Sequence, residues 1–349
     1  MEISKKKLEK SQLELTGELA QDIFESYRAK ALAHLGAHIE VDGFRKGHVP
    51  EAVLLKHISE NMLLEEMAEM AIAEHYPKIL EQENIDAIGR PEVAITKLAK
   101  GNPLGFKITT TVLPEIELPD YKKIAKDISK DGIKEVIVTD EEVDQTILQI
   151  RRMRAHNDLH AKGDIAHDDH THEEIKDEEL PPLDDEYAKQ LGNFESVAQF
   201  KDKLKENILL EKGKEAKSTL RLKISEAILE KTKADVPELL IESELSKMMF
   251  RLQTDVEQAG MTFEDYLKNI SKTENDIKAE WHNDAKKKAL LELVLFEISK
   301  REEIKLDETE VAQEVQGVLA YYKGADAVRA RAYVEQVLTH EKVFAILEN

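Results

Sequence analysis

The chain has 349 residues, of which 41% are apolar and 35% charged, and it lacks cysteine, which excludes disulfides, zinc–thiolate sites and thiol catalysis. Its net charge of −21 opposes general nucleic-acid binding, and no run of 18 or more apolar residues could form a membrane-spanning helix. The length suits two or three domains. Because the start of the chain lacks the apolar stretch of a secretion signal, we expect a cytoplasmic protein without membrane contacts.

Residues 1–113 are predicted to form an α+β domain. Polar and apolar residues alternate over 11–16, which predicts a strand, and the period then changes to that of a helix over 21–38. The expected buried face of this helix consists of Ile23, Tyr27, Ala31 and Leu35. Two more helices are predicted, one beginning at Pro50 and one over 61–83. Three short strands are predicted at 85–90, 92–97 and 105–113.

The remaining chain is predicted to be predominantly helical. Helix-start signals, in which a side-chain oxygen caps the first turn, occur at Thr139, Ser196, Thr262, Thr273 and Asp307. Two apolar stripes are predicted to be buried: Ile241, Leu245, Met248, Leu252 and Ala259 in one, and Ile277, Trp281, Ala285, Ala289, Leu293 and Phe296 in the other. Residues 114–155 must pack with later helices to bury their apolar face, so we expect 114–155 and 186–349 to form one discontinuous, elongated all-α domain.

Residues 156–185 lack periodicity and are predicted to form a disordered linker. The stretch 156–186 holds twelve acidic residues and two lysines, which leaves too little apolar surface to offset the entropy of ordering. Five histidines fall within seventeen residues: His156, His160, His167, His170 and His172. Imidazole with carboxylate suits Ni(II), Zn(II) or Cu(II), but a solvated linker with incidental histidines is the favoured interpretation, and no cofactor is expected.

The sharpest local signal is the loop 43–50 between two predicted helices. It consists of Gly43, Phe44, Arg45, Lys46, Gly47, His48, Val49 and Pro50. An aromatic residue followed by two cations could enter an apolar pocket while the cations engage carboxylates or phosphates. On the physical chemistry of these residues alone, an ordinary helix–helix turn with Phe44 folded onto the core is the favoured interpretation.

This loop resembles the ribosome-binding signature of bacterial trigger factor, with His48 at a position often held by lysine. The similarity extends over nearly the whole chain outside 156–185, including the element order through Pro119, the segment 136–143 and the turn 260–267. In that family the loop docks on the large ribosomal subunit near the polypeptide exit. The resemblance implies an ATP-independent, partly ribosome-associated chaperone for nascent and unfolded polypeptides, and it leaves a homodimer off the ribosome open.

Members of the family normally carry an FK506-binding-protein-like prolyl isomerase domain after the helix that ends near His156. Such a domain needs on the order of 100 residues, and only 156–185 are available here. The resemblance therefore implies a form without the isomerase domain. Residual prolyl isomerase activity is one alternative, and a general holdase with a metal-binding linker is another.

Soft apolar side chains at Met249, Phe250 and Met261 are candidates for contact with polypeptide clients, because flexible thioethers repack around varied partners. No Gly-rich phosphate loop, nucleophile elbow or His-Glu-x-x-His pair occurs in the sequence, so no catalytic residue is assigned.

Overall fold

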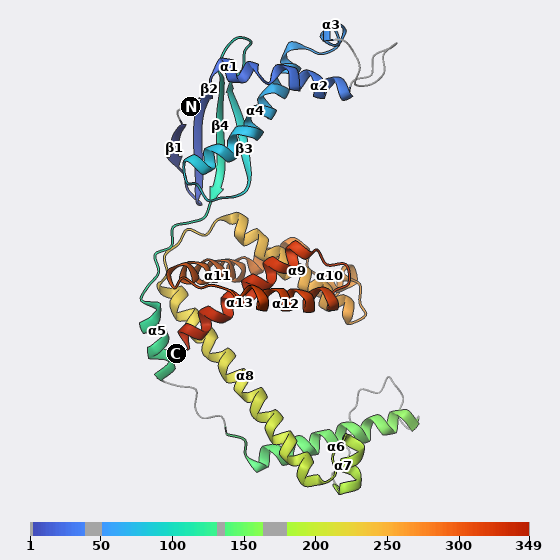
Figure 1. The fold of residues 1–349 in the computed structure, drawn as a ribbon. Helices are drawn as coiled ribbons and strands as arrows, with labels where there is room; N and C mark the ends of the chain where they lie inside the picture. The colour runs from blue at the N-terminus through green and yellow to red at the C-terminus, as the bar shows by residue number, and fades with distance from the viewer. Residues whose placement is uncertain (1–2, 39–50, 131–136, 163–179, 349) are drawn as a thin grey trace. The chain divides into compact units, whose positions relative to one another are not determined.

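The computed structural model describes residues 3–38, 51–130, 137–162 and 180–348 (Figure 1). The N-terminal region is an α+β fold made of β1 Ile3–Lys7, β2 Gln12–Leu19, α1 Gln21–Glu25, α2 Arg28–His38, α3 Glu51–Leu54, α4 Glu60–Gln82, β3 Ala87–Lys97 and β4 Leu104–Val112. The described residues beyond it are mostly helical, in α5 Tyr121–Lys130, α6 Asp140–Lys162, α7 Asp185–Leu191, α8 Val197–Lys231, α9 Glu238–Gln258, α10 Phe263–Ile270, α11 Glu274–Arg301, α12 Glu308–Tyr321 and α13 Ala327–Leu347. The predicted fold class is confirmed.

The N-terminal sheet is antiparallel throughout, with strand order β1-β2-β4-β3. Gln12 of β2 pairs with Thr111 of β4, so the central pair joins segments far apart in sequence. The prediction of separate strands at 85–90 and 92–97 is wrong, since both belong to β3. Pro91 is tolerated inside this strand because β3 lies at the sheet edge, and the register with β4 shifts between Ile88 and Glu92.

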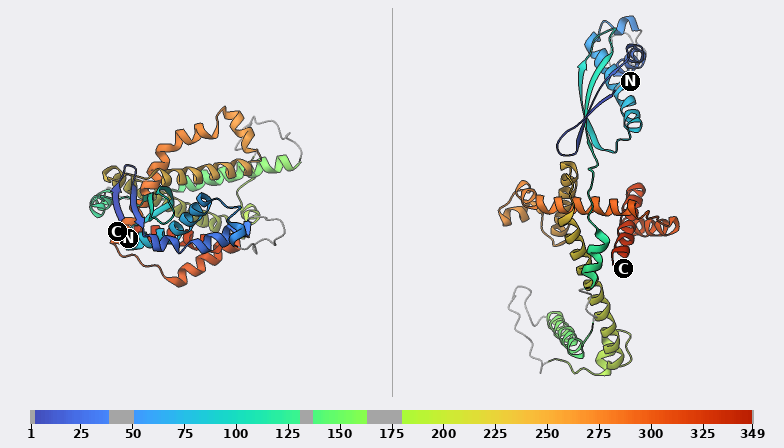
Figure 2. Two further views of the ribbon diagram at one scale, coloured as in Figure 1. Left: turned by 90° about the horizontal axis from the view of Figure 1, so that it is seen from above. Right: turned by 90° about the vertical axis from the view of Figure 1, so that its left-hand side faces the viewer.

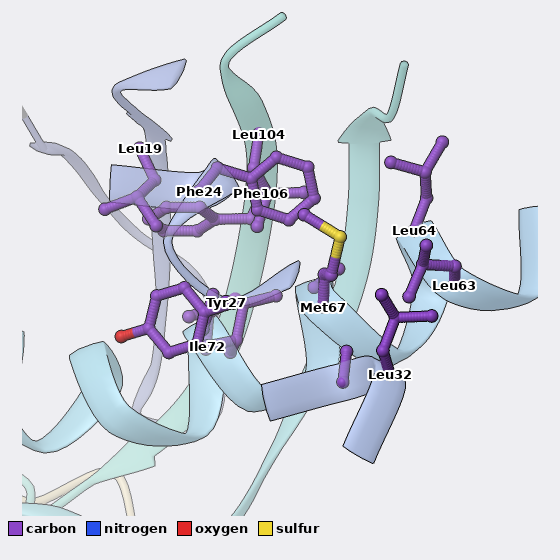
Figure 3. Packing of buried hydrophobic residues seen from close by; sticks show 14 of the residues in the cluster. Leu19, Phe24, Tyr27, Leu32, Leu63, Leu64, Met67, Ile72, Leu104 and Phe106 are labelled. Carbon is purple, nitrogen blue, oxygen red and sulfur yellow. The ribbon is translucent and has the colours of Figure 1, made fainter. Parts of the chain in front are cut away.

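The helices of this region lie on one side of the sheet (Figure 2). Apolar side chains of α1, α2 and α4 pack there against those of the strands (Figure 3). The predicted helix over 21–38 is interrupted after Glu25, and the Ser26 hydroxyl donates to the Ile23 carbonyl at 2.6 Å. Tyr27 and Ala31 are buried as predicted. Phe24 is 1% exposed and enters the core, whereas Ile23, predicted to be buried, is 40% exposed.

The predicted helix starts at Thr139, Thr262, Thr273 and Asp307 are confirmed, since each of these side chains caps the first turn of a helix. Thr139 and Glu142 exchange hydrogen bonds of 2.9 and 3.3 Å, and Thr273 with Asp276 forms a capping box. The Thr262 and Asp307 side chains also accept from the backbone of the first helical turn. Helix α6, in contrast, continues to Lys162 and passes the predicted end near 156, while residues 163–179 of the predicted linker lie outside the described residues.

The chain forms two compact units: residues 1–118 with 231–303, and residues 119–230 with 304–349. In the first unit, the partly buried Leu113 and Ile116 pack against the cluster of α9 and α11 that contains Ile241 and Ala289. The Ser11 hydroxyl donates to the Asp235 carbonyl at 2.6 Å, which ties the β1–β2 turn to the segment before α9. These units differ from the predicted domains, whose boundaries stay a prediction.

In the second unit, α6, α7 and α8 share a small core that includes Ile147, Ala188 and Phe200. Helix α8 is also joined to α13 by Arg221, which donates two hydrogen bonds of 2.7 Å to the Glu341 carboxylate and a third bond to Glu348. Because this guanidinium bridges two carboxylates, it fixes the last helix against α8.

Candidate functional site

The predicted docking residues Gly43, Phe44, Arg45, Lys46, Gly47, His48 and Pro50 lie outside the described residues. The segments on either side of 39–50 are described. They show how the ends of the loop are held.

Both flanking helices of the loop are anchored on the N-terminal core. Leu54, at the end of α3, is 3% exposed, and its Cδ2 lies 3.1 Å from the position that a Cβ on Gly36 of α2 would occupy. Glycine at this position therefore lets α2 and α3 approach closely. The His34 Nδ1 of α2 lies 2.7 Å from the Glu66 Oε1 of α4, which adds a polar contact on the other side of α2. The helices described on either side of 39–50 thus belong to one core.

The three predicted client-contact residues have different environments in the structure. Phe250 is 72% exposed on α9 and Met261 is 40% exposed after it. Met249 is only 8% exposed, because it shares the buried face of α9 with Ile241 and Leu245. The expectation of an exposed thioether at Met249 is therefore corrected. The predicted stripe on α11 also fails at its end, since Phe296 is 45% exposed.

The sequence interpretation missed the most exposed apolar surface of the described residues, on the helical hairpin of α12 and α13. Its large exposed side chains are Tyr321, Tyr322, Val328, Tyr333 and Val337, with exposed fractions of 80, 61, 79, 60 and 40%. The rings of Tyr321 and Tyr322 meet edge to face, with centroids 4.8 Å apart. The Tyr-Tyr pair directly before Lys323-Gly324 was a usable signal, because paired aromatics beside a glycine turn fit poorly into a helical core.

The carboxyl groups with displaced pKa values belong to ion pairs and helix caps. Hydrogen bonding to Lys107 lowers the pKa of Glu14, and hydrogen bonding to Arg221 lowers the pKa of Glu341. Backbone donors at the start of α12 likewise lower the pKa of Asp307. Among the described carboxyl groups with a displaced pKa, none is raised toward neutrality as a general acid would need.

The predicted metal-binding histidines are only partly within reach of the structure. His156 lies on α6, and His160 falls within the same helix, whereas His167, His170 and His172 lie outside the described residues. Within the described part of the chain, no group of three or more His, Asp or Glu side chains is placed to hold a metal ion. The same part contains no helix long and apolar enough to cross a membrane.

Two family models match the chain. The model described as "Bacterial trigger factor protein (TF)" covers residues 1–150, and the one described as "Bacterial trigger factor protein (TF) C-terminus" covers 196–348. A trigger factor from Agathobacter rectalis is 25% identical over 96% of this chain and 90% of its own length, and one from Clostridium beijerinckii is 26% identical over 89% and 88%. A solved structure described as "Promiscuous Substrate Recognition in Folding and Assembly Activities of the Trigger Factor Chaperone" aligns over 100% of this chain with a TM-score of 0.56 and 18% identity.

The α+β domain and helical body, together with these matches, define the chain as a molecular chaperone. It belongs to the bacterial trigger factor family.

The chain is a short form of this family. Neither family model matches residues 151–195, and the alignment to the Agathobacter rectalis relative spans 406 positions, more than the 349 residues present here. Helix α7 and the end of α6 occupy most of the described portion of that interval. The interval 151–195 is too short for an inserted domain of roughly 100 residues, so it does not hold the prolyl isomerase domain.

Proposed function

We propose that this chaperone docks on the large ribosomal subunit near the polypeptide exit and holds nascent or unfolded polypeptides without ATP. It would work in the cytoplasm, partly bound to ribosomes. The observation that carries the proposal is the loop 43–50, which lies inside the region matched by the N-terminal family model and whose flanking helices pack on one core.

The chemistry of the loop supports docking on a mixed protein and RNA surface. Phe44 can fill an apolar pocket, and Arg45 with Lys46 can engage carboxylates or phosphates, even though the chain as a whole carries a charge of −21. Anchoring by Leu54 and Gly36 limits the freedom that the loop ends lose on binding, which preserves affinity.

The exposed apolar side chains support the holding function. Phe250 on α9 and Tyr321 on α12 can contact apolar stretches of many clients, because each contact is weak and independent of sequence. Clients covered in this way aggregate less while they fold, and weak contacts release without nucleotide hydrolysis.

Docking is tested by the triple variant Phe44→Ala, Arg45→Ala, Lys46→Ala and co-sedimentation with ribosomes that carry no nascent chain. We expect the ribosome-bound fraction to fall at least tenfold. The matched control replaces Lys247, Phe250 and Arg251 with alanine, since this set also combines one aromatic residue with two cations, on α9. Unchanged co-sedimentation of the loop variant would refute docking through this loop, and equal loss in both variants would refute its specificity.

A further inference from the structure

The outer edge of β3 is open in the described structure. β3 stands at the end of the sheet order β1-β2-β4-β3 and pairs only with β4. In an antiparallel edge strand, alternate residues direct their N–H and C=O groups away from the sheet. Every residue from 92 to 97 is exposed, which is unusual for a strand of a sheet with one covered face.

Two apolar side chains of this edge lie on the covered face of the sheet. Val93 pairs with Ile108 and Ile95 pairs with Phe106, so their side chains stand beside residues that are only 1 and 2% exposed. Val93 and Ile95 themselves are 44 and 40% exposed. The apolar face of the sheet therefore continues onto β3, where the exposed side chains of Val93 and Ile95 form an apolar surface that we call the shelf.

The reason for this shelf is the position of α4, which packs over the central strands. A small void under α4 is lined by helix residues such as Ile72 and Ile79 and by Leu19, Leu104, Phe106 and Ile108 of β2 and β4. No residue of β3 lines it. Since α4 covers β2 and β4, the side chains of β3 receive little cover from the helices.

The two edges of the sheet differ in their protection. The short edge strand β1 contains Lys5, Lys6 and Lys7, and the first and last of these pair with Glu83 at 2.6 Å and Glu115 at 2.8 Å. Lysines on an edge strand oppose pairing with another chain. The segment 92–95 of β3 contains one charged residue, Glu92.

Irregular pairing limits the open edge to a short segment. The register with β4 shifts between Ile88 and Glu92 and again between Ile95 and Lys97, and pairing is regular from Glu92 to Ile95. An added strand could therefore pair over about four residues, which gives only a few backbone hydrogen bonds of about 1 kcal/mol each.

We propose that the edge 92–95 of β3 binds short extended segments of unfolded polypeptide by strand addition, with their apolar side chains on the shelf of Val93 and Ile95. Recognition through backbone hydrogen bonds is independent of the client sequence, and the shelf selects apolar residues at every second position. The proposal rests on the chaperone function but not on ribosome docking.

A second copy of the chain is a poorer occupant of this edge. Pairing over four residues covers far less than the roughly 1,600 Å² that a stable protein–protein interface buries. A transient, weakly held peptide fits the small contact, and a chaperone must release what it binds.

The binding test uses the full chain, without ribosomes, and a fluorescein-labelled octapeptide in which threonine and valine alternate between terminal lysines. Fluorescence anisotropy measures its affinity. We expect the double variant Val93→Lys, Ile95→Lys to weaken binding at least tenfold. The matched control Ile23→Lys, Met62→Lys changes two side chains with similar exposure, 40 and 45%, in the same α+β region, and should leave the affinity within twofold of the parent.

A milder variant, Val93→Thr with Ile95→Thr, preserves strand propensity and should weaken binding about threefold, which guards against a folding defect in the lysine variant. Two N-methylated probes test strand addition itself, one methylated on the valine nitrogens and one on the threonine nitrogens. Because alternate N–H groups face opposite sides of a strand, one probe should lose binding and the other should retain it.

Equal effects of the two methylated probes, or full binding to both β3 variants, would overturn the proposal. A dimer that dissociates in the lysine variant, without peptide binding by the parent, would assign the edge to a second copy and would overturn it as well. Loss of ribosome docking in the loop variant leaves these results unaffected, so the two proposals fail separately.

Discussion

The N-terminal α+β region and the α12–α13 hairpin differ in how far their large apolar side chains are exposed to solvent. Phe24 and Phe106 are 1 and 2% exposed within one core formed by strands and helices, whereas Tyr321 and Val328 are 80 and 79% exposed. The first region buries most of its large apolar side chains in a close-packed core, with Val93 and Ile95 of β3 among the exceptions, whereas the hairpin leaves several of them available to partners. The comparison teaches that one chain can combine a well-ordered platform with an adaptable surface.

The largest expected effect concerns the buried side of this comparison. Phe24→Ala removes a core side chain and should lower the free energy of unfolding by about 3–5 kcal/mol, measured by urea denaturation of the α+β region. The control Phe250→Ala, at a side chain that is 72% exposed, should change it by about 0.5 kcal/mol or less. A similar loss of unfolding free energy in both variants would show that burial does not set the contribution of these side chains to stability.

A smaller loss of stability is expected when the contact between α8 and α13 is weakened. Arg221→Met removes the hydrogen bonds to Glu341 and Glu348 and the contact of the guanidinium with the Phe344 ring at 4.9 Å. We expect a loss of about 1–2 kcal/mol, measured by thermal unfolding and allowing for solvent screening. The control Arg331→Met removes a more exposed pair with Glu308 and should cost clearly less.

The ion pair of Arg221 with Glu341 should make the stability of the protein depend on pH. Arg221 lowers the pKa of Glu341 in the folded state, so this stabilisation is complete above the unfolded carboxyl pKa of about 4.3 and is lost as the pH falls through the lower folded value. Acidification from about pH 6 to about pH 3 should therefore destabilise the parent more than Arg221→Met. An identical pH dependence of unfolding in the two proteins would contradict this assignment.

On the exposed side of the comparison, Tyr321→Ser with Tyr322→Ser should impair holding while leaving stability nearly unchanged. Light scattering during dilution of a guanidinium-unfolded test enzyme measures aggregation, and we expect the variant to need several times more chaperone for equal protection. Glu314→Ser with Gln316→Ser on the same helix serves as the control. Full protection by the tyrosine variant would show that the hairpin is dispensable.

The smallest expected effect is on proline isomerisation. Because residues 151–195 are too few for the isomerase domain, a protease-coupled peptide assay should show no acceleration above the uncatalysed reaction, which has a time constant of tens to hundreds of seconds. Acceleration that rises in proportion to protein concentration would favour residual isomerase activity elsewhere in the chain.

The features that depend on local chemistry could be predicted from the sequence. Thr139 and Thr273 cap helices through side chains only three residues away, and Gly260 ends α9 with φ of 81°. Features that depend on distant neighbours could not. Pro91 lies inside β3 because β3 has a partner on one side only, which the local sequence does not reveal.

The candidate site shows the same limit. Met249 was expected to be exposed, but it is 8% exposed, while its neighbour Met248 packs partly buried against the cluster of α9 and α11. Spacing alone does not show that both adjacent residues are covered. The exposed tyrosines of α12 were missed since exposure follows from what packs nearby. The docking role of Phe44, Arg45 and Lys46 stays a prediction that rests on the family.

The register of β2 with β4 has a consequence for the synthesis of the protein itself. Gln12 can pair with Thr111 only after roughly 100 further residues have been synthesised, and Ser11 can bond to Asp235 only later still. β2 can pair with β1 at once, but at translation rates of about 5–20 residues per second its other edge remains without β4 for roughly 5–20 s. A member of a chaperone family thus emerges with an unpaired strand edge of its own, and for its first seconds it exposes the kind of surface that a chaperone covers.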